Sequence, residues 1–210
     1  EGDVWTHTLM VLDAMTTLHS EEKKRNLCLS LAALCHDLGK ANTTRILDGR
    51  IDAIGHENSG VPLAESLLKK LTDETTLIEN ITTLVKLHLK PKQLYKEKAE
   101  SGAICRLATQ VNIETLSLLA KADFLGRTTK EALKGDFKAG EWLEKRAAEL
   151  GVLTSPLKPL LRGRDLITAG YPPSKAFKTI LEQAYEAQLD GCIKNREEAI
   201  QWLNKILKKD

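Results

Sequence analysis

The residues with the greatest capacity for chemistry in this chain are its histidines, one of which is followed directly by an aspartate. This doublet, His36-Asp37, ends the apolar stretch LCLSLAALCHDLGK. Burying an imidazole beside a carboxylate is costly unless another group compensates their charge and lone pairs. A divalent ion does so, and a His/Asp set suits Mn, Fe, Co, Ni, Zn or Mg. In this context the doublet indicates a metal site, although a doublet alone also fits a solvated helix end.

Two more residues extend the candidate metal site. Asp123 ends a second apolar run, LSLLAKAD, and His7 lies on the edge of an apolar helix face. Separate helices would then bring His7, His36-Asp37 and Asp123 to one point. The residues by themselves predict a divalent ion at the meeting point of these helices.

The elements that position these residues are expected to be helices. Apolar residues recur at steps of three and four, and the helices expected from this spacing cover 4–18, 22–37, 57–71, 74–89, 99–110, 113–124, 139–150, 174–189 and 196–208. Asp3 is a natural N-cap for the first helix, and Gly39 a natural stop for the second. Residues 40–56 are expected to form a loop, with a turn at Asp48-Gly49 and room for a short hairpin. The fold class is all-α.

A cluster of prolines and glycines between Pro156 and Pro173 is typical of a linker. We therefore expect two parts, residues 1–151 and a small C-terminal helical segment at 152–210. The first residue is Glu1 rather than Met, from which we expect a piece of a longer protein.

Composition excludes several classes of protein. The net charge of +2 is too small for a strongly basic nucleic-acid surface, and aromatic residues at 4% argue against one built on stacked rings. The cysteines show no metal-binding or redox spacing, so buried reduced thiols in a cytoplasmic protein are expected for Cys28, Cys35, Cys105 and Cys192. No apolar run is long enough to span a membrane, and no membrane partner is expected.

The order H…HD…D, carried by WTHTLMVLDA, LAALCHDLGK and LLAKADFLGR, resembles the HD superfamily of metal-dependent phosphohydrolases. Within it, EGDVWTHTL, CHDLGK, GHENSG and ADFLGR are similar to the HD region of bacterial tRNA nucleotidyltransferases (CCA-adding enzymes) and poly(A) polymerase-like relatives. The tail RDLITAGYPPSKAFKTILEQAYEAQLDGCIKNREEAIQWL resembles the C-terminal segment of that family. The resemblance covers almost the whole chain and implies an all-α HD helical bundle with a small C-terminal element.

Two departures limit what the resemblance implies. The tail has Tyr171-Pro172-Pro173-Ser174 where the family usually has Pro-Gly-Pro. No Gly-Ser pair followed by an Asp-x-Asp pair is present, so the nucleotidyltransferase core is absent from this chain and nucleotide addition cannot be assigned to it.

Carried over by residue, the resemblance implies metal ligation by His7, His36, Asp37 and Asp123. Asp37 is also a candidate catalytic residue that orients or deprotonates a water molecule. Lys40 and Arg127 are candidates for both catalysis and substrate binding, since either can pair with a phosphate group. A plain surface charge is an equal alternative for both.

His56 and His88 lie between the doublet and Asp123. They are expected to bind substrate phosphate or to hold a second metal ion, although a helix-cap role fits His56 equally well. His19 is expected to be exposed. The stretch KLHLKPKQLYKEK could track an RNA backbone, but a solvated loop and helix start is the favoured interpretation.

The function expected is divalent-metal-dependent hydrolysis of a phosphate ester in a nucleotide, a 2′,3′-cyclic phosphate or an RNA end. The alternative is a non-catalytic tRNA-binding or dimerising arm of a tRNA nucleotidyltransferase, with a residual metal site. A signalling-nucleotide hydrolase is a third and weaker option. The expected partners are a phosphorylated nucleotide or RNA, with tRNA and a second copy of the chain also compatible with the resemblance.

Overall fold

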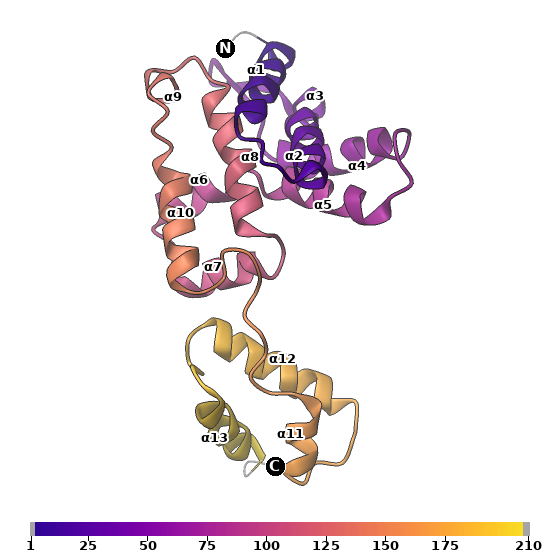
Figure 1. Cartoon of the computed structure of the whole chain (residues 1–210), viewed down its shortest axis with the longest axis vertical. Coiled ribbons are helices and arrows are strands. Elements are labelled where there is room, and N and C mark those ends of the chain that lie inside the picture. Colours follow the sequence, from indigo (N-terminus) through magenta and orange to yellow (C-terminus); the bar gives the residue numbers. More distant parts are fainter. Residues whose placement is uncertain (1–2, 208–210) are drawn as a thin grey trace.

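The computed structural model describes residues 3–207, and nearly all of its ordered elements are helices. Figure 1 shows their arrangement. In chain order they are α1 (Val4–Thr17), α2 (Lys23–Cys35), α3 (Lys40–Thr43), β1 (Arg45–Leu47), β2 (Arg50–Asp52), α4 (His56–Leu68), α5 (Thr75–Leu87), α6 (Lys90–Glu97), α7 (Ser101–Ala108), α8 (Ile113–Leu125), α9 (Lys130–Leu133), α10 (Lys138–Glu149), α11 (Gly163–Thr168), α12 (Ala176–Leu189) and α13 (Arg196–Leu207). The all-α prediction is confirmed.

The N-terminal helices pack around one hydrophobic cluster. Helix α1 begins where Asp3 accepts a hydrogen bond from the Thr6 amide at 2.9 Å, as the sequence predicts for an N-cap. Helix α5 contributes Ile78, Ile81 and Val85, whose spacing puts them on one buried face. Helices α1, α2, α5 and α8 each contact at least two others of this set. Together they form the helical body that carries the candidate metal ligands.

Several short elements differ from the sequence expectations. The loop 40–56 contains α3 and the antiparallel hairpin β1–β2, which turns at Asp48 and Gly49 with φ of 49° and 74°. Positive φ at both turn positions matches the twist of a two-residue hairpin. The lysine-rich stretch expected as loop forms α6, which has a proline in its first turn, where the missing amide proton costs nothing. Helix α11 lies inside the expected linker.

The C-terminal helices α11–α13 surround a second hydrophobic cluster, which includes Leu166, Ile180 and Leu203. Figure 1 shows these helices at one end, with α12 nearest to α7. Helix α12 carries residues of both clusters, since Leu189 belongs to the first. The division into residues 1–151 and 152–210 therefore stays a proposal.

A buried carboxylate, Asp165, ties α11 to α13. It accepts hydrogen bonds from the Arg162 amide at 2.7 Å and from Arg196 Nη2 at 2.5 Å. Burial raises the pKa of Asp165, but these hydrogen bonds and the arginine charge outweigh it and lower the pKa overall. A carboxyl group with a lowered pKa stabilises the fold above its unfolded-state pKa, and that contribution is lost as the pH falls through the folded value.

Asp165→Asn is expected to destabilise the C-terminal helices at neutral pH by about 2 kcal/mol, the range for hydrogen bonds to charged groups. Hydrogen–deuterium exchange of peptides from 163–203 would measure this, with peptides from α1, α2 and α5 as internal controls. The difference between variant and wild type should shrink as the pH falls below about 4, the ordinary pKa of an aspartate, toward the lower folded-state pKa at which the wild-type carboxylate protonates. If the variant and wild type differ as much at low pH as at neutral pH, the Asp165 carboxylate does not stabilise these helices in this way.

The four cysteines are free thiols. Burial raises the pKa of both Cys28 and Cys35 to about 11, which makes them poor nucleophiles. Cys105 is buried as expected, but Cys192 is exposed, contrary to the expectation of a buried thiol. Within residues 3–207, no helix has both the length and the apolar character to cross a membrane.

Candidate metal centre

The ends of separate helices bring four imidazoles and two carboxylates to one place. His36 and Asp37 directly follow α2, and His88 directly follows α5. The remaining three are His7 in α1, His56 at the start of α4, and Asp123 near the end of α8. All six side chains are buried. The sequence singled out these same residues, and the structure places them together.

Asp37 lies at the middle of this cluster, which we call the His/Asp cluster. Its Oδ2 atom is 3.3 Å from His36 Nε2 and 3.8 Å from His7 Nε2. Its Oδ1 atom is 3.2 Å from His56 Nε2. Two groups of potential metal ligands result, one of His7, His36 and Asp37, and one of Asp37, His56 and His88. Asp37 is the member that they share.

Asp123 adjoins the first group. Its Oδ1 atom is 3.0 Å from His7 Nε2 and 3.9 Å from His36 Nε2. The predicted set of four ligands is therefore assembled around the two carboxylates, and the His56 and His88 side chains face Asp37 from the other side.

Each of the four imidazoles has the same orientation. Its Nδ1 atom faces a backbone carbonyl, while its Nε2 atom faces the interior of the cluster. The carbonyl partners are Gly126 for His7 at 3.2 Å, Ala33 for His36 at 2.7 Å, Ala53 for His56 at 2.8 Å and Val85 for His88 at 2.6 Å. A carbonyl only accepts, so Nδ1 carries the proton and donates, which leaves the Nε2 lone pair for a metal ion.

The Nε2 atoms at the centre of the cluster show whether these residues fit a metal ion. His36 Nε2 is buried and has no hydrogen-bond partner among residues 3–207. His56 Nε2 and His88 Nε2 face each other at 3.3 Å. With Nδ1 protonated on both rings, two lone pairs oppose each other unless a proton or a cation lies between them. These residues therefore fit a divalent cation, and imidazole with carboxylate is a donor set for Mn, Fe, Co, Ni or Zn.

The electrostatics of the cluster keep its carboxylates ionised. Burial raises the pKa of Asp37, but the adjacent imidazoles of His36 and His56 and the charge of Lys40 hold that pKa far below the usual range. Burial also raises the pKa of Asp123, but His7 and the charge of Arg127 outweigh it and lower that pKa overall. At His88, burial lowers the pKa to about 4, so this ring is neutral at neutral pH and able to ligate.

Two glycines set the close approach of the helices. A Cβ atom at Gly39 would lie 2.0 Å from the His56 carbonyl oxygen and 2.6 Å from the Gly60 amide. Gly39 has a right-handed φ of −63° at the start of α3, so it is not the left-handed helix stop that the sequence predicts. A Cβ atom at Gly126 would lie 2.8 Å from the Val11 amide, in α1. The sequence indicates Gly39 only as a helix stop and does not single out Gly126, because close packing between distant segments leaves no local signal.

Lys40 and Arg127 contact the two carboxylates directly. Lys40 Nζ donates to Asp37 Oδ2, and Arg127 Nη2 donates to both Asp123 oxygens at 2.8 and 2.7 Å. Both cations are therefore at the edge of the cluster and partly buried. Neither is the isolated surface charge that the alternative interpretation expects.

Residues 4–125, more than half of the chain, match the family model described as HD domain. This chain belongs to the HD domain family. The matched residues include all six members of the His/Asp cluster. Membership in the HD family assigns the chain to the metal-dependent phosphohydrolases as a class, and its buried histidines and aspartates form groups able to hold a metal ion. No solved structure matches the chain at a significant level.

Proposed function

We propose that this HD domain hydrolyses phosphate esters, with His7, His36, Asp37 and Asp123 as ligands of a divalent metal ion. The observation that carries the proposal is the shared orientation of the imidazoles, whose Nε2 atoms face the interior of a buried site that also holds the carboxylates of Asp37 and Asp123. When bound, a divalent ion there would polarise a phosphoryl oxygen and generate a nucleophile from water at neutral pH.

The residues around the ligands have distinct proposed roles. Asp37 is the proposed residue that orients or deprotonates the attacking water, because both of its oxygens face the cluster. Arg127 also lines a hollow beside the cluster, from which its guanidinium can reach a phosphate oxygen. Lys40 lines a separate hollow, on the α1–α2 side of Asp37, and is the corresponding cation there. Such fixed cations stabilise the charge that develops on phosphorus.

The proposed substrates are a nucleotide, a 2′,3′-cyclic phosphate or an RNA-end phosphate in the cytoplasm. The similarity of CHDLGK, ADFLGR and the C-terminal tail to tRNA nucleotidyltransferases supports this choice, and it makes tRNA the proposed macromolecular partner. Self-association as a homodimer is part of the same proposal.

A hydrolysis assay tests the function directly. Metal-stripped protein would be loaded with Mn, Co or Ni and incubated with 2′-, 3′- and 5′-nucleoside monophosphates, 2′,3′-cyclic nucleotides and a 3′-phosphorylated oligoribonucleotide. Release of phosphate or opening of the cyclic ester is expected with at least one metal, and a chelator should abolish it. If no metal supports turnover of any substrate, the enzyme proposal fails.

The second ligand group yields a prediction about metal stoichiometry. We propose that Asp37, His56 and His88 hold a second ion, with Asp37 shared between the two sites. Reconstituted protein should then contain two ions per chain, whereas His88→Ala should retain one, because the ligands of the first site are intact. Elemental analysis after gel filtration would count the ions. A single ion in wild type, unchanged in His88→Ala, would support a substrate-binding role for His88 instead.

A second candidate function is a non-catalytic tRNA-binding arm with a residual metal site. It is favoured by one observation, namely that Lys40 and Arg127 already neutralise the two carboxylates without an ion. Tight, salt-sensitive tRNA binding together with no hydrolysis in the assay above would select this candidate.

A further inference from the structure

A hollow of about 530 Å³ opens directly beside the His/Asp cluster, with His88 and Asp123 in its wall. Its volume lies in the range of pockets that take one small organic ligand. The opposite wall comes from residues 127–139, which lie after the residues that match the HD family. This wall is therefore a feature of this chain beyond the matched domain.

The wall of this first hollow is aromatic. The rings of Phe124 and Phe137 are stacked, with centroids 5.0 Å apart and planes at 26°. Ala120 and Ala139 pack with them in a small cluster, in which Phe137 is buried and Phe124 is partly exposed, so the wall of the hollow beside the pair is apolar. A planar ring is the shape that such a surface accommodates best.

A second hollow shares one lining residue with the first. Tyr95 lines both, and Trp142, Lys96, Lys98 and Arg146 line the second. The Tyr95 and Trp142 rings meet edge to face, with centroids 5.8 Å apart. The chain has only three Trp, three Tyr and three Phe, yet four of these nine line the two hollows. The composition argued against stacked rings, but the fold concentrates the few that exist.

Cations accompany the rings along this path. Lys92, Arg127, Lys134 and Lys138 line the first hollow together with Asp123, Glu131 and Asp136. The residues that line the second hollow include Lys96, Lys98 and Arg146 and no acidic side chain, although Arg146 pairs with nearby Glu149. Positive charge therefore becomes less balanced with distance from the His/Asp cluster.

Lys98 is held in an unusual conformation at the end of α6. Its φ of 52° lies in the left-handed region, and its amide donates to the Tyr95 carbonyl at 3.2 Å. Glycine would satisfy this helix end with less strain. A lysine in such a position is consistent with a role for its charge rather than its backbone preference.

We propose that the two hollows form one groove for the end of a single-stranded nucleic acid. The terminal nucleotide places its phosphate at the His/Asp cluster and its base against Phe124 and Phe137. The adjacent nucleotide stacks on Tyr95, with its backbone beside Lys98. Stacking platforms next to cations are the usual means of binding single strands without strong sequence preference. The inference deepens the proposed function by choosing among its substrates, and it favours a strand end over a free mononucleotide.

Binding measurements test the groove without relying on turnover. Fluorescence anisotropy with labelled hexaribonucleotide and hexadeoxyribonucleotide would be measured on the full chain in a chelator, with adenosine monophosphate as competitor. At least one hexamer should bind about tenfold tighter than the mononucleotide, since each stacked base contributes about this factor or more. The stronger hexamer identifies the type of strand.

Two variants probe the second hollow. Tyr95→Leu should weaken hexamer binding about tenfold and mononucleotide binding less, because Tyr95 also lines the first hollow. Lys98→Gly should weaken hexamer binding and lower the slope of log affinity against log salt by about 0.7, the value for one phosphate contact to a single strand. Its thermal stability should not fall, because glycine relieves the left-handed strain, so weaker binding cannot be due to unfolding.

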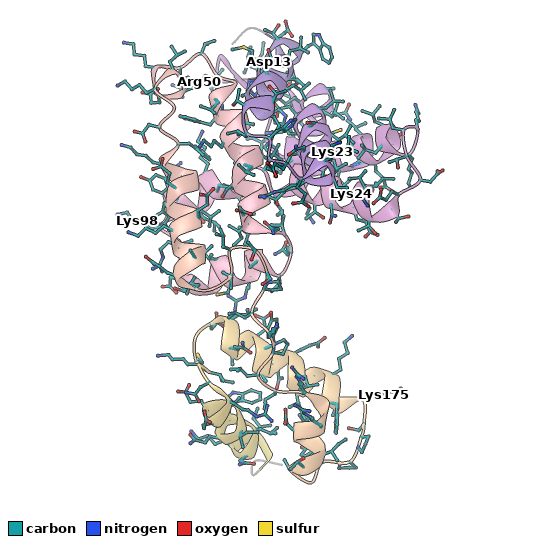
Figure 2. All side chains as sticks on the ribbon, in the orientation of Figure 1. Asp13, Lys23, Lys24, Arg50, Lys98 and Lys175 are labelled. Atoms are coloured by element: carbon teal, nitrogen blue, oxygen red, sulfur yellow. The ribbon has the colours of Figure 1, made fainter. Side chains whose placement is uncertain are left out.

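The matched control is a pair of glutamine substitutions. Lys98→Gln should weaken hexamer binding, while Lys23→Gln should not, because Lys23 is an exposed lysine on α2, on the other side of the view in Figure 2. The groove is excluded if neither hexamer binds tighter than the mononucleotide, or if the Lys98 and Tyr95 variants bind as well as Lys23→Gln. Hydrolysis of nucleotides without such binding would leave the proposed function intact, and such binding without hydrolysis would leave the groove intact.

Discussion

Asp37→Asn is expected to lower phosphoester hydrolysis by about 10³-fold, because a bound metal contributes several kcal/mol to transition-state stabilisation. Asp37 belongs to both ligand groups, and its two oxygens face different histidines. An amide keeps one oxygen and replaces the other with an N–H donor, which repels a cation. The variant should therefore lose metal as well as activity, measured by elemental analysis and by turnover of the best substrate.

The control for this change is Asp13→Asn, at an exposed aspartate of α1. Figure 2 labels Asp13 at the surface. This variant should keep full activity and metal content, while urea unfolding shows whether both variants remain folded. Activity within tenfold of wild type in folded Asp37→Asn would contradict the role given to this carboxylate.

Gly39→Ala is expected to destabilise the protein by about 3 kcal/mol, at the upper end of the usual cost of overpacking. The new Cβ atom would lie 2.0 Å from a backbone oxygen and 2.6 Å from a backbone nitrogen, and neither atom belongs to a flexible side chain. Relief requires the turn between α2 and α3 to move away from α4, which moves His36 and Asp37 away from His56. Urea unfolding followed by circular dichroism would measure the free energy, and elemental analysis the metal retained.

The same substitution at Gly163 is a matched control. A Cβ atom there meets only Phe177 Cδ2, at 3.8 Å, which is ordinary contact. Alanine in place of glycine in α11 should leave stability unchanged or raise it by up to about 1 kcal/mol. If Gly39→Ala proves as stable as Gly163→Ala, the close approach of the Gly39 turn to α4 does not set the geometry of the His/Asp cluster.

The identity of the site residues could be predicted from sequence because burial and polarity conflict visibly at them. His36-Asp37 and Asp123 end apolar runs, and that contrast is a local signal. Their common orientation could not be predicted, because it depends on which carbonyl each Nδ1 atom meets. For His7 that carbonyl belongs to Gly126, which is 119 residues away in the chain.

The helices with a clear apolar period were predicted to within a few residues, and the short ones were missed for definite reasons. Helix α6 buries Pro91 and Leu94 but exposes most of its lysines, so its sequence is typical of a solvated loop. Helix α11 has six residues, and its start is held by the Asp165 carboxylate rather than by an apolar face. A hydrogen bond between Arg196 and Asp165 also stabilises this short helix, and no local sequence pattern reveals that contact.

Metal content measured on one pair of proteins tests the central claim most directly. Wild type and His36→Ala would be stripped, reloaded with Mn, Co or Ni, passed through a desalting column and measured by elemental analysis. His36 is the ligand whose buried Nε2 has no hydrogen-bond partner in the described part of the chain, so its loss should remove most of the retained ion. We predict at least one tightly held ion per wild-type chain and a large loss in folded His36→Ala. Wild type that retains no ion with any of the three metals would contradict the metal centre and the hydrolysis that depends on it.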